Sequence, residues 1–136
     1  MTKMIRIRKV SEQTEKDLLE INNLIPQLSQ SAKLLTKTEF TSLLDAESTH
    51  LYFAEENEQV LGMLSLVTFP IPTGLRGWVE DVVVDTKARG KGVGKLLTMH
   101  ALKEAQKMGV LTIDLTSRPV VMLPIDSTNL LDFLHG

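Results

Sequence analysis

The chain has 136 residues, no cysteine and a formal net charge of −2, with 15 lysines and arginines against 17 aspartates and glutamates. This length fits one domain over residues 1–136, and the lack of cysteine excludes disulfides, thiolate zinc sites and a cysteine nucleophile. The charge argues against general nucleic-acid binding. We expect a cytoplasmic protein, because the N-terminal residues differ from a signal peptide and no apolar run approaches the roughly 18 residues of a membrane span.

The N-terminal region predicts a strand followed by a helix. Isoleucine alternates with arginine over 5–9, which indicates a half-buried strand. Ser11 or Thr14 can cap the helix, and we expect Pro26 to end it. The stripe of this helix that should face the core consists of Leu18, Leu19, Ile21, Asn22 and Ile25.

A polar loop over 27–37 precedes a second, short helix and a β-hairpin. Thr36 and Glu39 have the spacing of a capping box, so the helix should begin there and continue through Leu44. Two strands over 51–55 and 60–69 flank a polar turn. Their residues are almost continuously apolar, so both faces of this hairpin should be covered. Prolines and a glycine over 70–74 predict a loop.

The stretch from Trp78 to Lys95 carries the strongest functional signal. A β-branched run ends at Asp85 and Thr86, and a glycine-rich turn then leads directly into a helix. Such a turn lets backbone N–H groups approach an anion, and the helix start adds unpaired donors and partial positive charge. We predict a phosphate-binding turn made by Arg89, Gly90, Lys91, Gly92, Val93, Gly94 and Lys95.

Spacing excludes two common phosphate motifs. A P-loop would need glycine where Arg89 stands and serine or threonine where Leu96 stands. The dinucleotide fingerprint GxGxxG would need a third glycine at position 95, which is lysine.

The remaining elements are a helix and a strand. Apolar residues recur at helical spacing from Val93 to Met108, and Gly109 follows as a C-terminal cap. Alternation over 111–115 predicts the strand. The expected order is therefore strand, two helices, three strands, helix, strand.

The central stretch and the element order resemble the GCN5-related N-acetyltransferases, the GNAT superfamily. Arg89, Gly92 and Gly94 match its acyl-coenzyme A signature, and Val79–Asp85 resembles the fourth strand of glucosamine-phosphate and other small-amine acetyltransferases. The resemblance implies an α+β fold with a mixed, mostly antiparallel sheet flanked by helices. It also implies acetyl-CoA as the donor, no metal, and a small-molecule or peptide amine as the acceptor, with no nucleic-acid or membrane partner.

The resemblance also implies roles for individual residues. The backbone of Val82, Val83 and Val84 would pair with the pantetheine arm, and the first two helices would form a wall of the acceptor cleft. Glu80 matches a frequent strand glutamate and is our candidate base for the amine; strand alternation predicts Trp78, Glu80 and Val82 on one face and Asp81 on the other. The family often uses a tyrosine as the acid, but the only tyrosine here is Tyr52, in another strand.

The last residues depart from the family. Residues 116–119 resemble the lead into its fourth helix, but Pro124 and β-branched residues follow. We expect that helix and the last two strands to be missing, so that 1–119 is family-like and 120–136 is an atypical tail. The strand at 111–115 would then have an unpaired edge. We expect residues 120–125 to fold back onto it, or the edge to pair with a second copy as a homodimer.

Our hypothesis for this tail is a reading frame that slipped by one base near Val120. Each shifted codon would take the last base of one observed codon and the first two bases of the next. Permitted codons then read R-D-A-A-N-R-L-Y-Q-L-T-G-F across residues 120–133, which is the missing family motif. A naturally divergent tail is the alternative.

Two other functions compete with an active acetyltransferase. One is a catalytically impaired module that binds acetyl-CoA, because the tail lacks the family's tyrosine. The other is a regulatory phosphate-binding or dimerisation domain. His50, His100 and His135 share no ligand spacing, and we expect Trp78 and the methionines to lie in the core.

Overall fold

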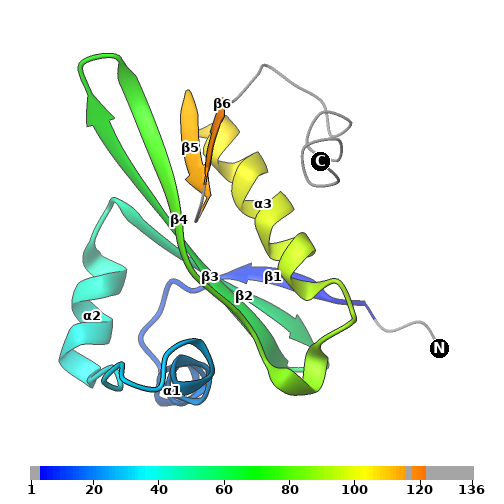
Figure 1. Cartoon of the computed structure of the whole chain (residues 1–136). Coiled ribbons are helices and arrows are strands. Elements are labelled where there is room, and N and C mark those ends of the chain that lie inside the picture. Colours follow the sequence, from blue (N-terminus) through cyan, green and yellow to red (C-terminus); the bar gives the residue numbers. More distant parts are fainter. Residues whose placement is uncertain (1–3, 116–117, 122–136) are drawn as a thin grey trace.

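The fold places one six-stranded sheet between helices (Figure 1). The computed structural model describes residues 4–115 and 118–121. The predicted order of elements is confirmed, with one strand added after it. The elements are β1 Arg6–Lys9, α1 Glu15–Leu28, α2 Lys37–Asp45, β2 Thr49–Glu56, β3 Gln59–Ile71, β4 Gly74–Val84, the short 3-10 helix η1 Thr86–Ala88, α3 Val93–Lys107, β5 Thr112–Leu115 and β6 Arg118–Val121.

The strands lie in the sheet in their order along the chain, β1-β2-β3-β4-β5-β6. Every neighbouring pair is antiparallel except β4 and β5, which are parallel and joined through α3. The predicted α+β fold with a mixed, mostly antiparallel sheet is therefore confirmed.

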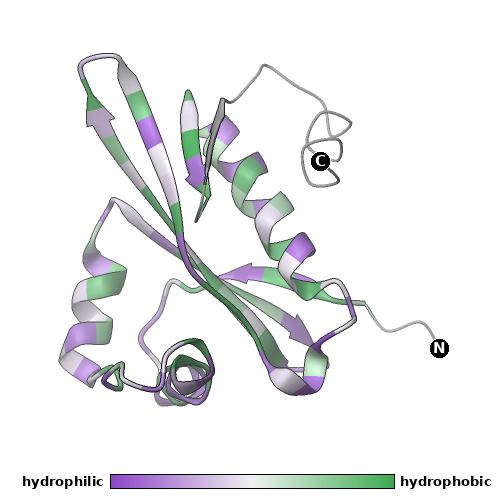
Figure 2. Cartoon of the chain, in the orientation of Figure 1, coloured by the Kyte–Doolittle hydropathy of each residue, from purple (hydrophilic) through white to green (hydrophobic). Residues whose placement is uncertain are grey.

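Each face of the sheet has its own hydrophobic core. Leu97, Ala101 and Leu102 of α3 pack with Tyr52 and Leu64 on one face. On the other face, Ile21 and Leu24 of α1 and Phe40 of α2 pack with Phe53 of β2 and Met63 of β3. Figure 2 shows apolar and polar residues alternating around α3, as expected for a helix with one buried face. The prediction that the central hairpin is covered on both faces is confirmed.

Helix α1 uses one of its two predicted caps and differs from the prediction at Pro26 and Leu19. Thr14 is the cap that the helix uses, accepting a hydrogen bond from the Asp17 N–H. Pro26 lies inside the helix, which continues to Leu28; a proline in the last turn removes one N–H bond, and the Ser29 N–H still reaches the Ile25 carbonyl at 2.9 Å. Leu19 is 61% exposed, because it lies off the stripe that faces the sheet.

A polar network holds α1 against the sheet. Arg8 of β1 donates hydrogen bonds to both Asp17 of α1 and Glu55 of β2, with its Nε 2.6 Å from Glu55 Oε1. These bonds raise the pKa of Arg8 above its usual range. Asn22 bonds the backbone of Leu35 in both directions, at 2.7 and 3.0 Å. The loop between α1 and α2 is thereby fixed on the same side as α1.

The two hairpins of the sheet have short turns. Asn57 and Glu58 both have positive φ, as a tight two-residue turn between β2 and β3 requires. The residues predicted as a loop over 70–74 are instead mostly strand, because β3 extends to Ile71 and β4 begins at Gly74. Gly74 has a φ of 133°, which few other residues adopt. The hairpin therefore extends beyond the helices (Figure 1).

Strand β6 covers the edge of β5. It pairs antiparallel with all of β5, from Leu115 opposite Arg118 to Thr112 opposite Val121. A substitute strand was predicted here for residues 120–125; the observed strand begins two residues earlier, and residues 122–125 lie outside the described part of the chain. The family motif hypothesised for residues 120–133 lies mostly outside it too, and pairing with a second copy stays a prediction.

Candidate functional site

Strand β4 is interrupted by a β-bulge next to the expected site. Ser65 of β3 pairs with Glu80, but Met63 pairs with Val83, so one residue of β3 faces two of β4. Asp81 has a φ of 51°, in the left-handed region that aspartate adopts more readily than most side chains. Bulges of this kind re-aim side chains and are frequent beside active sites.

The bulge changes the faces that strand alternation predicted. Val82 packs against the core on the α3 side, and Val83 belongs to the core on the α1 and α2 side. Asp81 lines a cavity together with Ser65 and Met63, on the α1 and α2 side. Glu80 pairs with Ser65 and so lies on that side too. The prediction that Val82 shares a face with Glu80, and that Asp81 faces away, is therefore wrong.

Beyond the bulge, β4 has an open edge. It pairs with β5 only from Arg76 to Val79. Residues 80–84 pair with β3 on one side and, among the residues that the structure describes, with no strand on the other. Figure 1 shows β5 beside only the hairpin half of β4. Backbone N–H and C=O groups along this edge can bind an extended ligand in the manner of an added strand.

The open edge leads into the glycine-rich turn. Gly90 and Gly92 have φ values of 88° and 74°, and a Cβ on either would meet nothing within 4 Å. Gly92 is the N-cap of α3 and makes no side-chain hydrogen bond to it. The start of a helix offers N–H donors without intrahelical acceptors and the positive end of the helix dipole, and here it lies beside the exposed Arg89.

Two contacts attach this turn to the rest of the fold. Lys91 Nζ lies 3.5 Å from Glu56 Oε1, at the β2–β3 turn. The Gln27 side chain of α1 accepts a hydrogen bond of 2.9 Å from the Thr86 N–H, just after β4. The second contact joins the last turn of α1 to the segment between the open edge and the glycine-rich turn.

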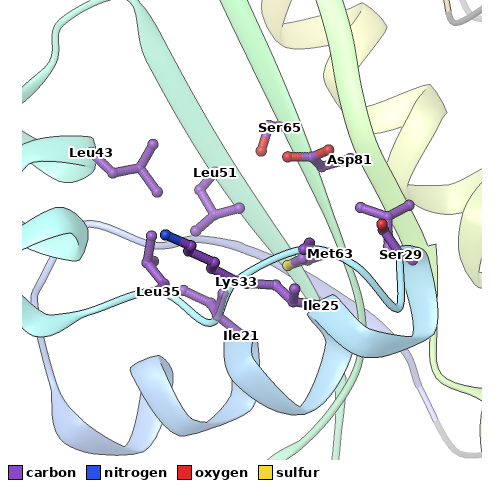
Figure 3. A pocket seen from close by; sticks show the side chains of 12 residues that line it. Ile21, Ile25, Ser29, Lys33, Leu35, Leu43, Leu51, Met63, Ser65 and Asp81 are labelled. Carbon is purple, nitrogen blue, oxygen red and sulfur yellow. The ribbon is translucent and has the colours of Figure 1, made fainter.

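A cavity of about 390 Å³ lies on the other side of the bulge, between α1, the loop after it, α2 and the sheet (Figure 3). It meets β4 at Asp81. Most of its lining is aliphatic: it comprises Ile21, Ile25, Leu28, Ser29, Ala32, Lys33, Leu35, Leu43, Leu51, Met63, Ser65 and Asp81. The exposed Glu80 does not line it.

Other predicted residues lie away from this cavity. Tyr52 is buried in the α3-side core, where burial raises its pKa to about 12, and its ring contacts His100 edge-on at 5.0 Å. Trp78 was expected in the core but is 44% exposed, because α1 and α2 do not extend over the hairpin half of β4. Within the described residues there is no group of three or more potential metal ligands.

Sequence reasoning missed Asp81 because a bulge is set by pairing with β3, which the sequence of one strand does not reveal. The spacing of residues in β4 carries one local signal of the bulge. Glu80 and Asp81 are adjacent polar residues, and Val79 and Val82 are three positions apart although both pack on the α3 side. A strict alternation with period two cannot accommodate that spacing.

Comparison with known proteins identifies the family. The family model described as the Acetyltransferase (GNAT) family matches residues 16–120. The chain therefore belongs to the GNAT family, whose members transfer acetyl groups from acetyl-CoA.

Solved structures share the fold. Glucosamine-6-phosphate N-acetyltransferase from Arabidopsis thaliana is 22% identical, with a TM-score of 0.72 over 97% of this chain and 89% of that chain. An aminoglycoside acetyltransferase from an uncultured soil metagenomic sample, in complex with sisomicin, is 15% identical. Its TM-score is 0.75 over 96% of this chain and 85% of that chain. A predicted acetyltransferase with acetyl-CoA from Clostridium acetobutylicum is 18% identical, with a TM-score of 0.65 over 85% of this chain and 82% of that chain.

No curated protein sequence matches the chain. Among the described residues, no helix has the length and hydrophobicity needed to cross a membrane.

Proposed function

We propose that this chain transfers the acetyl group of acetyl-CoA to a primary amine of a small molecule or peptide. One observation carries the proposal: the open edge of β4 ends at the glycine-rich turn on one side and meets the cavity at Asp81 on the other. A ligand extended along this edge would place its pyrophosphate at residues 89–95, its pantetheine arm along Val82, Val83 and Val84, and its thioester at the bulge.

In the proposed reaction the amine nitrogen attacks the thioester carbon. A tetrahedral oxyanion forms, the C–S bond breaks, the nitrogen loses a proton and the departing sulfur gains one. Backbone N–H groups at the bulge would stabilise the oxyanion. The amine must be neutral when it attacks, although its pKa near 10 keeps it mostly protonated at neutral pH.

The two carboxylates at the bulge have different proposed roles. Asp81 lines the cavity and would hold the incoming ammonium group. Glu80 lies on the same face and is exposed, so it would take the proton directly or through water and pass it to solvent.

A second candidate function is a catalytically impaired module that binds acetyl-CoA. The environment of Tyr52 favours it. This tyrosine is 1% exposed in the core beside α3 and does not line the cavity, so it cannot protonate the leaving sulfur. A general acid typically contributes about 10² to 10⁴ to the rate, so its absence would slow transfer without preventing cofactor binding.

The test measures release of free thiol from acetyl-CoA with a panel of primary amines. We expect Glu80→Gln to lower kcat by about 10² and to change its dependence on pH, and Asp81→Asn mainly to raise KM. Lys103→Gln, an exposed change on α3, is the control. An unchanged rate and pH profile in Glu80→Gln would refute the assignment of the base, and binding without thiol release for any amine would favour the impaired module.

A further inference from the structure

The cavity beside Asp81 has an apolar body. Eight of its lining residues are isoleucine, leucine, methionine or alanine, and its volume is about 390 Å³. Polar atoms enter it from few side chains, chiefly Asp81, Ser65, Ser29 and Lys33. An acceptor with several hydroxyl groups would lose hydrogen bonds to water on entering and find few partners there.

The two charged groups of the cavity are well separated. Figure 3 shows Asp81 and Ser65 at one end and the Lys33 side chain at the other, among Leu35, Leu43 and Leu51. Within the described residues, Asp81 has no hydrogen bond or salt bridge, and Lys33 has no salt bridge but interacts electrostatically with the exposed Glu39 of α2. The cavity thus offers one anionic end, an apolar middle and one cationic end.

We infer that the acceptor is a monoamine with an apolar body, and this inference rests on the proposed function. Its ammonium group would pair with Asp81 at the bulge, and its hydrocarbon part would replace water along the leucine and isoleucine walls. Lys33 would oppose a second cationic group at the far end, which disfavours polyamines and aminoglycosides. The scarcity of polar partners opposes phosphorylated amino sugars, although their phosphate alone could pair with Lys33.

A matched pair of amines tests the role of Lys33. Hexylamine and 1,6-diaminohexane differ only in the second ammonium group, which would lie near Lys33. Binding of each is measured by calorimetry to the full chain saturated with coenzyme A, so that no turnover is required. We expect hexylamine to bind about tenfold more tightly, equivalent to about 1.4 kcal/mol, because the second ammonium group would face a like charge. Lys33→Gln should reduce that ratio toward one.

A matched pair of variants tests the apolar wall. Leu28 and Leu19 are both exposed leucines of α1, at 40% and 61%, but only Leu28 lines the cavity. We expect Leu28→Gln to weaken hexylamine binding severalfold and Leu19→Gln to leave it unchanged. Both changes are at exposed positions, so both variants should fold; circular dichroism checks this.

The outcomes separate this inference from the proposed function. Preferred binding of hexylamine, with the expected effects of Lys33→Gln and Leu28→Gln, supports the inference whether or not thiol is released. Equal or better binding of 1,6-diaminohexane or glucosamine 6-phosphate overturns it, even if acetyl transfer to those amines is observed. Absence of thiol release with every amine, despite hexylamine binding, contradicts the proposed function alone.

Discussion

At the scale of single residues, Asp81 is the residue of β4 that lines the cavity. Its positive φ turns the carboxylate toward the cavity while Val82, the next residue, packs on the opposite face. Non-glycine residues in this region of φ and ψ carry strain, which the pairing of β3 and β4 on both sides of the bulge must offset. The bulge places a charged group beside an open strand edge, while Val82 packs against one core and Val83 belongs to the other.

Gly62 makes the close packing beneath this bulge possible. A Cβ at this position would lie 2.8 Å from the Val83 carbonyl oxygen and 3.2 Å from Val93 of α3. The carbonyl belongs to the backbone of β4 and cannot move alone.

We therefore expect Gly62→Ala to lower the free energy of unfolding by about 1 to 3 kcal/mol, measured by urea denaturation. Gly94→Ala is the packing control, because its nearest atom, in Val84, would be 3.6 Å away. Equal stability of the Gly62→Ala and unaltered proteins would show that β4 and α3 are less tightly packed than the structure indicates.

At the scale of elements, β2 and α3 enclose a cluster of ionisable residues away from the site. His50 of β2 is 9% exposed; its Nε2 is 3.4 Å from Thr68 Oγ1, and its Nδ1 is buried without a hydrogen-bond partner. His100 of α3 contacts Tyr52 and lies 4.0 Å from Glu104. Burial is the main cause that lowers the pKa of both histidines.

This cluster predicts a loss of stability in mild acid. A histidine whose pKa is lower in the folded state binds protons more readily when unfolded. Its contribution is therefore fully present above the unfolded pKa of about 6.5 and is lost as pH falls from that value through the lower folded pKa. The slope is at most about 1.4 kcal/mol per pH unit for each histidine. Urea denaturation between pH 7.5 and 5.5 measures it.

The control for this prediction is the double variant His50→Gln/His100→Gln. The difference in slope between this variant and the unaltered protein isolates the two histidines from the carboxylates. Identical slopes would mean that neither histidine titrates differently in the folded and unfolded states.

Elements whose signals are local could be predicted from sequence. The capping box of Thr36 and Glu39 forms with bonds of 2.9 and 3.1 Å, and the glycine-rich turn leads directly into α3 as predicted. Features set by contacts between distant segments could not. The bulge at Asp81 depends on register with β3, and the exposure of Trp78 depends on how far α1 and α2 extend over the sheet.

At the scale of the whole molecule, the fold brings three separate parts together along β4. The glycine-rich turn lies at one end of the open edge, the bulge interrupts it, and α1 and α2 enclose the cavity beside the bulge. The bond between Gln27 and Thr86 connects the cavity wall to the segment before the turn. Strand β6 pairs with the same residues of β5, 112–115, on the edge opposite β4, so within the described part of the chain it does not cover the backbone of residues 80–84.

The most direct test of this account is calorimetric titration of the full chain with acetyl-CoA, compared with adenosine 3′,5′-bisphosphate. We predict saturable one-to-one binding of acetyl-CoA, about tenfold or more tighter than the bisphosphate, since a few backbone hydrogen bonds along β4 contribute roughly 0.5 to 1.5 kcal/mol each. Equal affinity for both would restrict recognition to the glycine-rich turn, and no binding of acetyl-CoA would contradict the assignment of the open edge as the cofactor site.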